Sequence, residues 1–312
     1  MTKTQTSAYV SQAHLFKQQK RKRSRLNFGK GMLFLFPSLL LFSVFLFYPM
    51  ARTLYLSFFL TDNRGMATVF VGFENFTRIF SSDLFIKSLT STFLFVLYTV
   101  PGTILIALFL AILANEKLRG IGIFRMIFSS TMGISVAAAS VFWLFLFHPS
   151  IGFLNQILSW FGVGAIGWLT DPSWALFSVS ISTIWMNLGF TFLILLGGLQ
   201  SIDRYLYESA DIDGAGYFYK LRRITIPMLS PTLFFVVTVT MINAFQTFGQ
   251  IDMLTRGGPQ NETNLLVYSI YREAFVNYQY GTASAQAVIL FAIILLMTLI
   301  QFKLGEKKVH YQ

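Results

Sequence analysis

Long runs without a charged residue dominate the chain and alternate with short polar stretches. Each run holds at least the roughly 20 residues that cross a bilayer as an α-helix. The runs occupy residues 31–51, 88–115, 126–170, 173–202, 224–251 and 274–302. The third is too long for one span, and its apolar residues after Pro149 recur at helical spacing, which predicts a span followed by a helix lying in the membrane interface.

The pattern therefore predicts an all-α membrane protein with six transmembrane helices. We expect the spans at about residues 31–51, 88–114, 124–147, 174–199, 226–249 and 284–303. A soluble helical core is disfavoured, because almost no polar chain remains to cover six such runs. The first run is followed by residues 48–52 rather than by a small-residue cleavage site, so we expect it to remain as a span and not to act as a cleavable signal peptide.

Composition agrees with this class and narrows the chemistry. Hydrophobic residues make up 54% of the 312 residues and charged residues 12%, against about 25% charged in ordinary soluble domains. The absence of cysteine excludes disulfides, thiolate metal sites and cysteine catalysis. The three histidines are far apart in sequence, so neither a metalloenzyme nor another membrane enzyme with clustered acid, base or metal ligands is expected.

Positive charge predicts the orientation. Residues 1–30 carry many Lys and Arg residues and no Asp or Glu, and basic residues recur in the second and fourth loops and at the C-terminus. By the positive-inside rule both termini are expected in the cytoplasm. Residues 17–25 could also suggest nucleic-acid binding, but beside a first span a basic cytoplasmic tail that contacts membrane lipid is favoured, without nucleic acid as a partner.

Apart from Arg125 and Lys303 at their ends, the expected spans contain no Asp, Glu, Lys or Arg. A proton relay needs ionisable groups inside the membrane, so proton-coupled transport is disfavoured, whereas sodium coordination by backbone carbonyls stays open. Two spans instead carry a stripe of polar and aromatic residues at helical spacing. The stripes are Thr183, Asn187 and Phe190 on the fourth span and Thr240, Asn243 and Thr247 on the fifth. They suit a hydroxyl-rich, uncharged solute, and packing between helices through small polar residues is the alternative.

The segment between the fourth and fifth spans predicts two short helices that protrude into the cytoplasm, called the knob here (residues 201–224). Ser201 or Asp203 can cap the first helix. Gly214 permits a turn with positive φ, and a second helix follows from about Tyr217 toward Pro227. The knob has apolar, acidic and basic faces without a catalytic constellation, which favours a docking surface.

Several segments carry a resemblance to a known family. They are residues 71–76, 152–155, 168–172, 198–200, 207–210, 212–215, 224–227 with Pro231, 254–259 with Thr263, and 274–275 with Gly281. In order and spacing these segments resemble the membrane subunits of binding-protein-dependent ABC importers, in the sugar-type branch related to maltose and glycerol-phosphate permeases. Ser209 stands where the family usually has Ala and Asp203 where Pro is common. Residues 129–132 lack a proline often found there, which leaves the bend of the third span open.

The resemblance implies a type I ABC importer permease fold over residues 31–312 and a location in the bacterial cytoplasmic (inner) membrane. It implies that the knob sits in a cleft of an ATPase subunit and that the two polar stripes lie at or near the solute site. The coupling residues it implies are Glu208, Ser209, Ala210, Asp213, Gly214 and Pro227. The expected function is the permease subunit of an ATP-driven, binding-protein-dependent importer. The alternative is a six-span secondary carrier or channel for a small polar solute that works alone.

The partners implied are a second permease subunit, two ATP-binding subunits, an external solute-binding protein and a sugar or oligosaccharide. The chain itself lacks a phosphate-binding loop, since Gly29 and Lys30 are not preceded by the required glycine. Residues 162–167 spell the dinucleotide-binding fingerprint, but no strand precedes them, and they are interpreted as a loop. We therefore expect no enzyme activity and no cofactor in this chain, with ATP and Mg²⁺ on the partner subunits.

Overall fold

The computed structural model describes residues 31–116 and 118–305. The predicted basic tail, residues 1–30, lies outside the described residues. The chain divides into two compact units, Met1–Tyr55 and Leu56–Gln312. The described part of the first unit is a helix that runs from Gly31 and ends at Leu56, just past the boundary; it includes a π-helical turn, η1 (Ser43–Phe47), and α2 (Tyr48–Leu56). This helix is long and apolar enough to cross a membrane.

The second unit contains three further unbroken helices of that kind, α4 (Asp83–Asn115), α8 (Pro172–Gln200) and α15 (Tyr280–Gly305). Two bent helix pairs, Ile121–Gly133 with Val136–Leu146 and Tyr217–Met228 with Ser230–Phe245, also have the required composition. If each bent pair counts as one span, the described chain has six, as the sequence predicts.

The third span, expected at about residues 124–147 with its bend left open, is broken in the structure. It consists of α5 (Ile121–Ser129), a 3₁₀ turn η2 (Ser130–Gly133) and α6 (Val136–Leu146), and the two arms meet at 108°. The break occurs without proline, because Ile134 is extended and the Ser135 side chain caps α6 by accepting from the Ala138 N–H at 3.3 Å. A short helix, α7 (Phe153–Trp160), follows at the position of the expected interfacial helix.

The fifth span also differs from the prediction of residues 226–249. It bends by 65° between α11 (Ile226–Met228) and α12 (Ser230–Phe245), and after Phe245 the chain turns into α13 (Gly249–Leu254). At Gly249 an added Cβ would lie 2.6 Å from Val136 Cγ1, so α13 packs directly against α6. This contact requires the chain to leave the axis of α12, which explains the early end of the helix.

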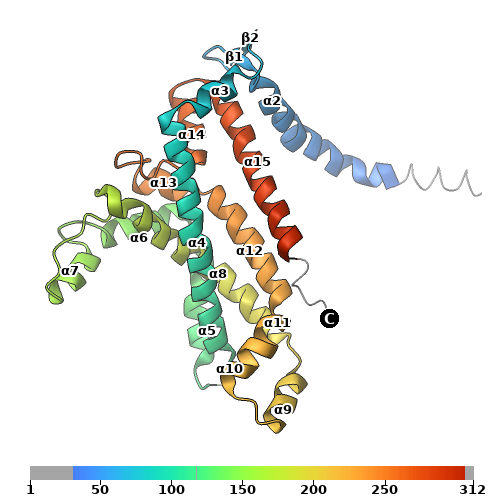
Figure 1. Cartoon of the computed structure of the whole chain (residues 1–312), viewed down its shortest axis with the longest axis vertical. Coiled ribbons are helices and arrows are strands. Elements are labelled where there is room, and N and C mark those ends of the chain that lie inside the picture. The colour runs from blue at the N-terminus through green and yellow to red at the C-terminus, as the bar shows by residue number, and fades with distance from the viewer. Residues whose placement is uncertain (1–30, 117, 306–312) are drawn as a thin grey trace, which may run out of the picture. The chain divides into compact units, whose positions relative to one another are not determined.

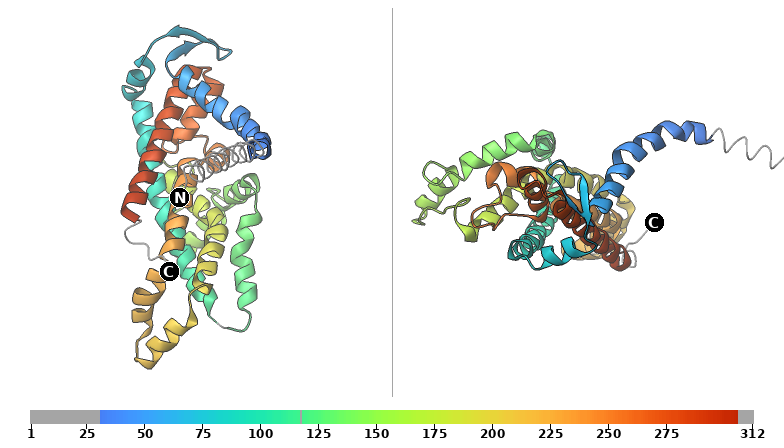
Figure 2. Two further views of the ribbon diagram at one scale, coloured as in Figure 1. Left: turned by 90° about the vertical axis from the view of Figure 1, so that its right-hand side faces the viewer. Right: turned by 90° about the horizontal axis from the view of Figure 1, so that it is seen from above.

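A small hairpin departs from the all-α prediction. Strand β1 (Phe59–Thr61) pairs antiparallel with β2 (Ala67–Phe70), and α3 (Glu74–Phe80) follows. The α14 helix (Leu266–Tyr271) and the π-helical turn η4 (Arg272–Val276) precede α15. Within the second unit the hairpin and α3 lie at one end, while α9 (Arg204–Ile212) and α10 (Tyr217–Lys220) lie at the opposite end, and α4, α12 and α15 run between them (Figures 1 and 2).

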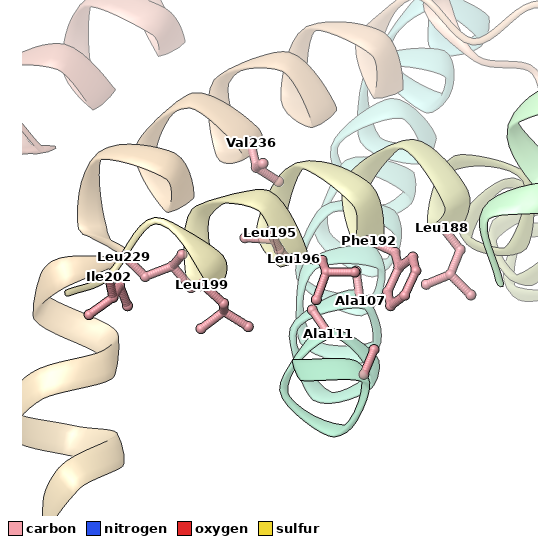
Figure 3. Packing of buried hydrophobic residues seen from close by; sticks show 11 residues of the cluster. Ala107, Ala111, Leu188, Phe192, Leu195, Leu196, Leu199, Ile202, Leu229 and Val236 are labelled. Atoms are coloured by element: carbon pink, nitrogen blue, oxygen red, sulfur yellow. The ribbon is translucent and has the colours of Figure 1, made fainter. Parts of the chain in front are cut away.

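The central packing of the second unit is between α4 and α8. Buried alanines of α4, Ala107 and Ala111, lie against side chains of α8 such as Phe192 and Leu196 (Figure 3). Small residues on one helix let two membrane helices approach closely. Farther toward the hairpin the same face of α4 carries buried hydroxyl residues, including Thr99 and Thr103. This contact with α4 holds α8 in place, and the C-terminal end of α8 leads into the knob.

Candidate coupling site and solute-path residues

The first helix of the knob is α9 (Arg204–Ile212), and its start is set by Asp203. Asp203 Oδ1 accepts from the Tyr205 N–H at 2.9 Å, so Asp203 is the cap of the two candidates in the sequence. Ser201 instead donates its hydroxyl to the Gly198 carbonyl at 2.8 Å. Gly214 has φ +70°, the left-handed conformation expected of the turn, and α10 (Tyr217–Lys220) follows.

One side of the knob is packed onto the membrane helices. Ala210 is buried, and Leu206 and Tyr207 pack against the cluster that contains Leu199 and Leu229. The Tyr207 hydroxyl lies 3.0 Å from Thr225 Oγ1 and shares a hydrogen bond with it. Since Thr225 ends the π-helical turn η3 (Leu221–Thr225), the knob is joined to the roots of both α8 and α11.

The opposite side of the knob is exposed and combines acids with large apolar side chains. Glu208 is exposed, and within the described part of the chain its ion-pair partner is Arg204 one turn earlier, at 3.1 Å between Arg204 Nε and Glu208 Oε1. Ile212 is 87% and Phe218 81% exposed beside the Gly214 turn. The sequence analysis did not single out these two residues. For Ile212 a signal was present, because an apolar residue directly before the Asp213-Gly214 turn is expected at an exposed position. Exposed apolar side chains of this size are typical of contact surfaces.

The predicted coupling residues thus occupy different positions. Glu208, Asp213 and Gly214 lie on the exposed side, whereas Ser209 is half-buried and Ala210 is buried. Pro227 lies apart from them in α11, at the root of the knob. An ion pair of 2.6 Å between Lys220 Nζ and Asp211 Oδ1 ties α10 to α9.

The residues of the two polar stripes fall into two groups, one bonded within the chain and one accessible. Thr183 and Thr240 are buried, and their hydroxyls donate to carbonyls of their own helices, Val179 at 2.9 Å and Val236 at 2.6 Å. The Thr247 hydroxyl likewise donates to the Asn243 carbonyl at 3.0 Å. These three donors are therefore already used within the chain.

The other three stripe residues present accessible side chains. Asn187 and Phe190 on α8 are half-buried, and Asn243 on α12 is exposed. The Gln250 amide reaches α8 from α13 through a contact of 3.1 Å to Met186 Sδ, next to Asn187 in sequence. Two amides and an aromatic ring on neighbouring helices are able to hydrogen-bond and stack against a hydroxylated solute. Among the described residues no cluster of His, Asp or Glu could hold a metal ion.

Membrane-crossing helices with accessible polar side chains and a protruding helical knob define the architecture of a membrane permease. Residues 69–310 match the family described as binding-protein-dependent transport system inner membrane component. The chain belongs to this family.

Relatives and solved structures agree. The chain is 37% identical over 278 residues to the sn-glycerol-3-phosphate transport system permease protein UgpA of Agrobacterium fabrum, covering 88% of this chain and 94% of that protein. It is 35% identical over 281 residues to UgpA of Pectobacterium atrosepticum, with the same coverage of 88% and 94%.

A chain in the crystal structure of a bacterial ABC transporter involved in the import of the acidic polysaccharide alginate superimposes with a TM-score of 0.76 at 25% identity, covering 94% of this chain and 99% of that one. A chain in the crystal structure of a bacterial alginate ABC transporter in complex with an alginate pentasaccharide-bound periplasmic protein gives a TM-score of 0.75 at 25% identity, covering 93% of this chain and 96% of that one. The chain is thus an inner-membrane permease of a binding-protein-dependent ABC importer, and the type I importer fold is confirmed. A carrier or channel that works alone is not supported.

Proposed function

We propose that this chain forms one half of the passage of an ATP-driven importer for a sugar-like solute. In this proposal a second permease subunit forms the other half, two ATP-binding subunits hold ATP and Mg²⁺, and an external solute-binding protein delivers the solute. Both termini and the knob face the cytoplasm, which agrees with the excess of Lys and Arg in those segments.

The exposed side of the knob carries the proposal. Its carboxylates, Glu208 and Asp213, and its apolar residues, Ile212 and Phe218, are accessible on a helix pair that is packed firmly on its other side. A carboxylate there can pair with a basic group of the ATPase cleft, and the exposed apolar side chains can be buried in it. The Gly214 turn brings the backbone to the tip of the knob without a side chain.

A change in the ATPase pair would then shift the permease between two states. ATP stabilises the closed arrangement of the ATP-binding subunits, and a ligand that binds one state better shifts the population toward it. Because the knob packs on α8 and on the Thr225 turn, its displacement would move the helices that bear Asn187 and Asn243. This is the step by which the passage would face alternately outward and inward.

Asn243 and Gln246 support a second permease subunit and a polar passage. Both are exposed in this single chain although they lie at the end of a membrane helix. An amide facing lipid hydrocarbon lacks hydrogen-bond partners, so such side chains face protein or a water-filled passage. The partner subunit would supply the opposite wall.

The proposed solute class is a sugar or oligosaccharide. The accessible stripe residues, Asn187, Phe190 and Asn243, offer amides and a ring without a fixed charge. The relatives named for sn-glycerol-3-phosphate and the transporter named for alginate handle hydroxyl-rich solutes. Hydroxyl recognition is the feature that these solutes share with the proposed one.

The test uses the assembled importer in lipid with its solute-binding protein. Glu208→Lys should abolish solute-stimulated ATP hydrolysis. The α9 helix itself should stay folded, because the exposed Arg204–Glu208 pair contributes only about 0.3–0.5 kcal/mol to it. Arg204→Gln is the matched control, since it breaks the same pair and keeps the carboxylate. Unchanged stimulation in Glu208→Lys would remove the docking role. Concentrative uptake by the chain alone, driven by an ion gradient, would overturn the proposed function.

A further inference from the structure

The hairpin end of the second unit is held together by one buried side chain. Asn75 is fully buried, and its Nδ2 donates to the Ser57 carbonyl at 2.9 Å and to the Phe59 carbonyl at 3.0 Å. A Cβ at Gly281 would collide with the Phe59 carbonyl oxygen, so α15 starts in direct contact with β1. The Gly281 N–H also donates to Thr61 Oγ1 at 3.1 Å. These bonds fix the hairpin and α3 on the start of α15.

The same asparagine positions an arginine. Arg78 Nη2 donates to Asn75 Oδ1 at 2.7 Å and to Thr282 Oγ1 at 3.3 Å. No acidic group of the described chain lies within ion-pair distance of Arg78. In the hairpin turn, the Asp62 carboxylate already accepts hydrogen bonds from the N–H groups of Arg64 and Met66. Arg78 therefore presents a pre-oriented guanidinium with unused donors.

A pocket of about 340 Å³ opens at this arginine, between the hairpin, α3 and the start of α15. Arg78 is the one charged side chain among its lining residues, which otherwise offer amides and hydroxyls. The polar lining includes Thr61, Asn63, Asn277, Gln279 and Thr282. A second cavity of about 170 Å³ shares Arg78, and there Glu273 and the 4% exposed Gln286 contribute to the wall. The buried Gln286 Oε1 has no hydrogen-bond partner in the described chain.

The chemistry of this pocket selects a carboxylate. A guanidinium with free donors binds a carboxylate in a planar, two-pronged arrangement. The surrounding amides can hydrogen-bond the remaining oxygen lone pairs or the water around them. Glu273 faces only the smaller cavity, so the larger pocket retains the positive potential of Arg78.

The location of the pocket indicates which molecule supplies the carboxylate. Its lining residues belong to the hairpin, α3 and the region around the start of α15. These elements lie at the end of the second unit opposite to the knob (Figures 1 and 2), whereas Asn187 and Asn243 lie within α8 and α12. If the knob faces the cytoplasm, the pocket faces the side from which a solute-binding protein approaches. We propose that the Arg78 pocket receives an acidic side chain of the solute-binding protein, an inference that rests on the proposed function.

The first experiment measures binding of the importer's purified solute-binding protein to the assembled complex in lipid nanodiscs. Arg78→Gln should weaken binding about tenfold or more and reduce its dependence on salt, because an interfacial charge pair is removed. Arg64→Gln is the matched control: Arg64 is exposed in the hairpin turn, is absent from the lining of the pocket and carries the same charge. It should change binding less than twofold. Basal ATP hydrolysis should stay unchanged in both variants.

A second experiment identifies the partner group. Arg78→Lys introduces an amine that a zero-length carbodiimide can couple to a paired carboxylate, and mass spectrometry of the cross-linked complex should show an Asp or Glu of the solute-binding protein attached at position 78. Arg64→Lys should give no such product.

The outcomes are distinguishable. Wild-type binding in Arg78→Gln, or no cross-link at position 78, would overturn the inference and leave the proposed function intact. Reduced solute uptake with unchanged affinity for the binding protein would overturn it in favour of direct contact with the solute. Failure of the unmodified complex to engage any solute-binding protein would instead contradict the proposed function.

Discussion

The Gly189 N–H donates to Thr131 Oγ1 at 2.9 Å, which joins the break in the third span to the middle of α8. Both groups are buried. A Cβ at Gly189 would lie 2.5 Å from that oxygen and 2.9 Å from the Met132 nitrogen, so the 3₁₀ turn approaches α8 as closely as a glycine allows. The 108° bend is therefore anchored from outside the span rather than made by a proline.

Gly189→Ala should destabilise the assembled complex by about 1–3 kcal/mol, because the added methyl group overpacks this contact. Thermal denaturation of the purified complex in detergent should show a midpoint several degrees lower. Gly197→Ala is the control in the same helix, because no atom lies within 4 Å of its Cβ position. There the higher helix propensity of alanine should raise stability by up to about 1 kcal/mol. Equal midpoints for the two variants would show that the Thr131 contact contributes nothing.

Gly214 and Gly216 offer a second matched pair, in the knob. Gly214 has φ +70° and Gly216 has φ −70°, and neither Cβ position meets another atom within 4 Å. Gly214→Ala should cost about 1–2 kcal/mol through backbone strain alone and lower solute-stimulated ATP hydrolysis, whereas Gly216→Ala should do neither. Gly214→Asn should be milder than Gly214→Ala, since asparagine tolerates the left-handed conformation. The reverse order would contradict the assigned turn.

Asn155 is expected to be a structural centre of the loop between α7 and α8. Its amide donates to the carbonyls of Pro149 and Ile166 at 2.9 and 3.0 Å, and its Oδ1 accepts from the Ile166 N–H at 3.1 Å and from Trp168 Nε1 at 2.9 Å. Asn155→Ala leaves these groups unpaired and should cost about 3 kcal/mol. The exposed neighbour Gln156 provides the control, and Gln156→Ala should change the thermal midpoint little.

The accessible and the buried stripe residues should behave differently in transport. Asn187→Leu combined with Asn243→Leu should lower the rate of solute uptake about 30-fold with assembly intact, because the two lost hydrogen bonds to the solute cost about 1 kcal/mol each. Thr183→Val and Thr240→Val should change uptake less, since these hydroxyls are bonded within their own helices. Loss of assembly in the Asn double variant would indicate a packing role instead.

Local signals made much of the knob predictable. Asp203 caps a helix and Gly214 has a positive φ because these properties depend on a few consecutive residues. Uncharged runs likewise located the membrane helices, because the hydrocarbon thickness sets their length. The predicted docking and solute roles of Glu208 and Asn187 remain predictions, since their partners are other molecules.

Features that depend on contacts distant in sequence were not predictable. The break after Gly133 relies on Gly189, 58 positions from Thr131, and the end of α12 relies on the contact of Gly249 with Val136. The hairpin is too short to show a clear strand pattern, and Asn75 and Gly281 stabilise it from elsewhere. Thr183 and Asn187 lie one turn apart on the same helix face. Helical spacing alone therefore does not show that the hydroxyl of Thr183 is hydrogen-bonded within the helix while the amide of Asn187 is accessible.

Two ties of the knob have a mechanical consequence: the Asp211–Lys220 ion pair within it, and the hydrogen bond from Tyr207 to Thr225 at its root. Together they brace α9 and α10 as one stiff piece with two points of attachment, one at the end of α8 and one at the start of the fifth span. A sideways push on α9 is then transmitted as torque to both helices at once, with little absorbed by bending. Without these ties, the packing of Leu206 and Tyr207 against the membrane helices would have to transmit this torque alone.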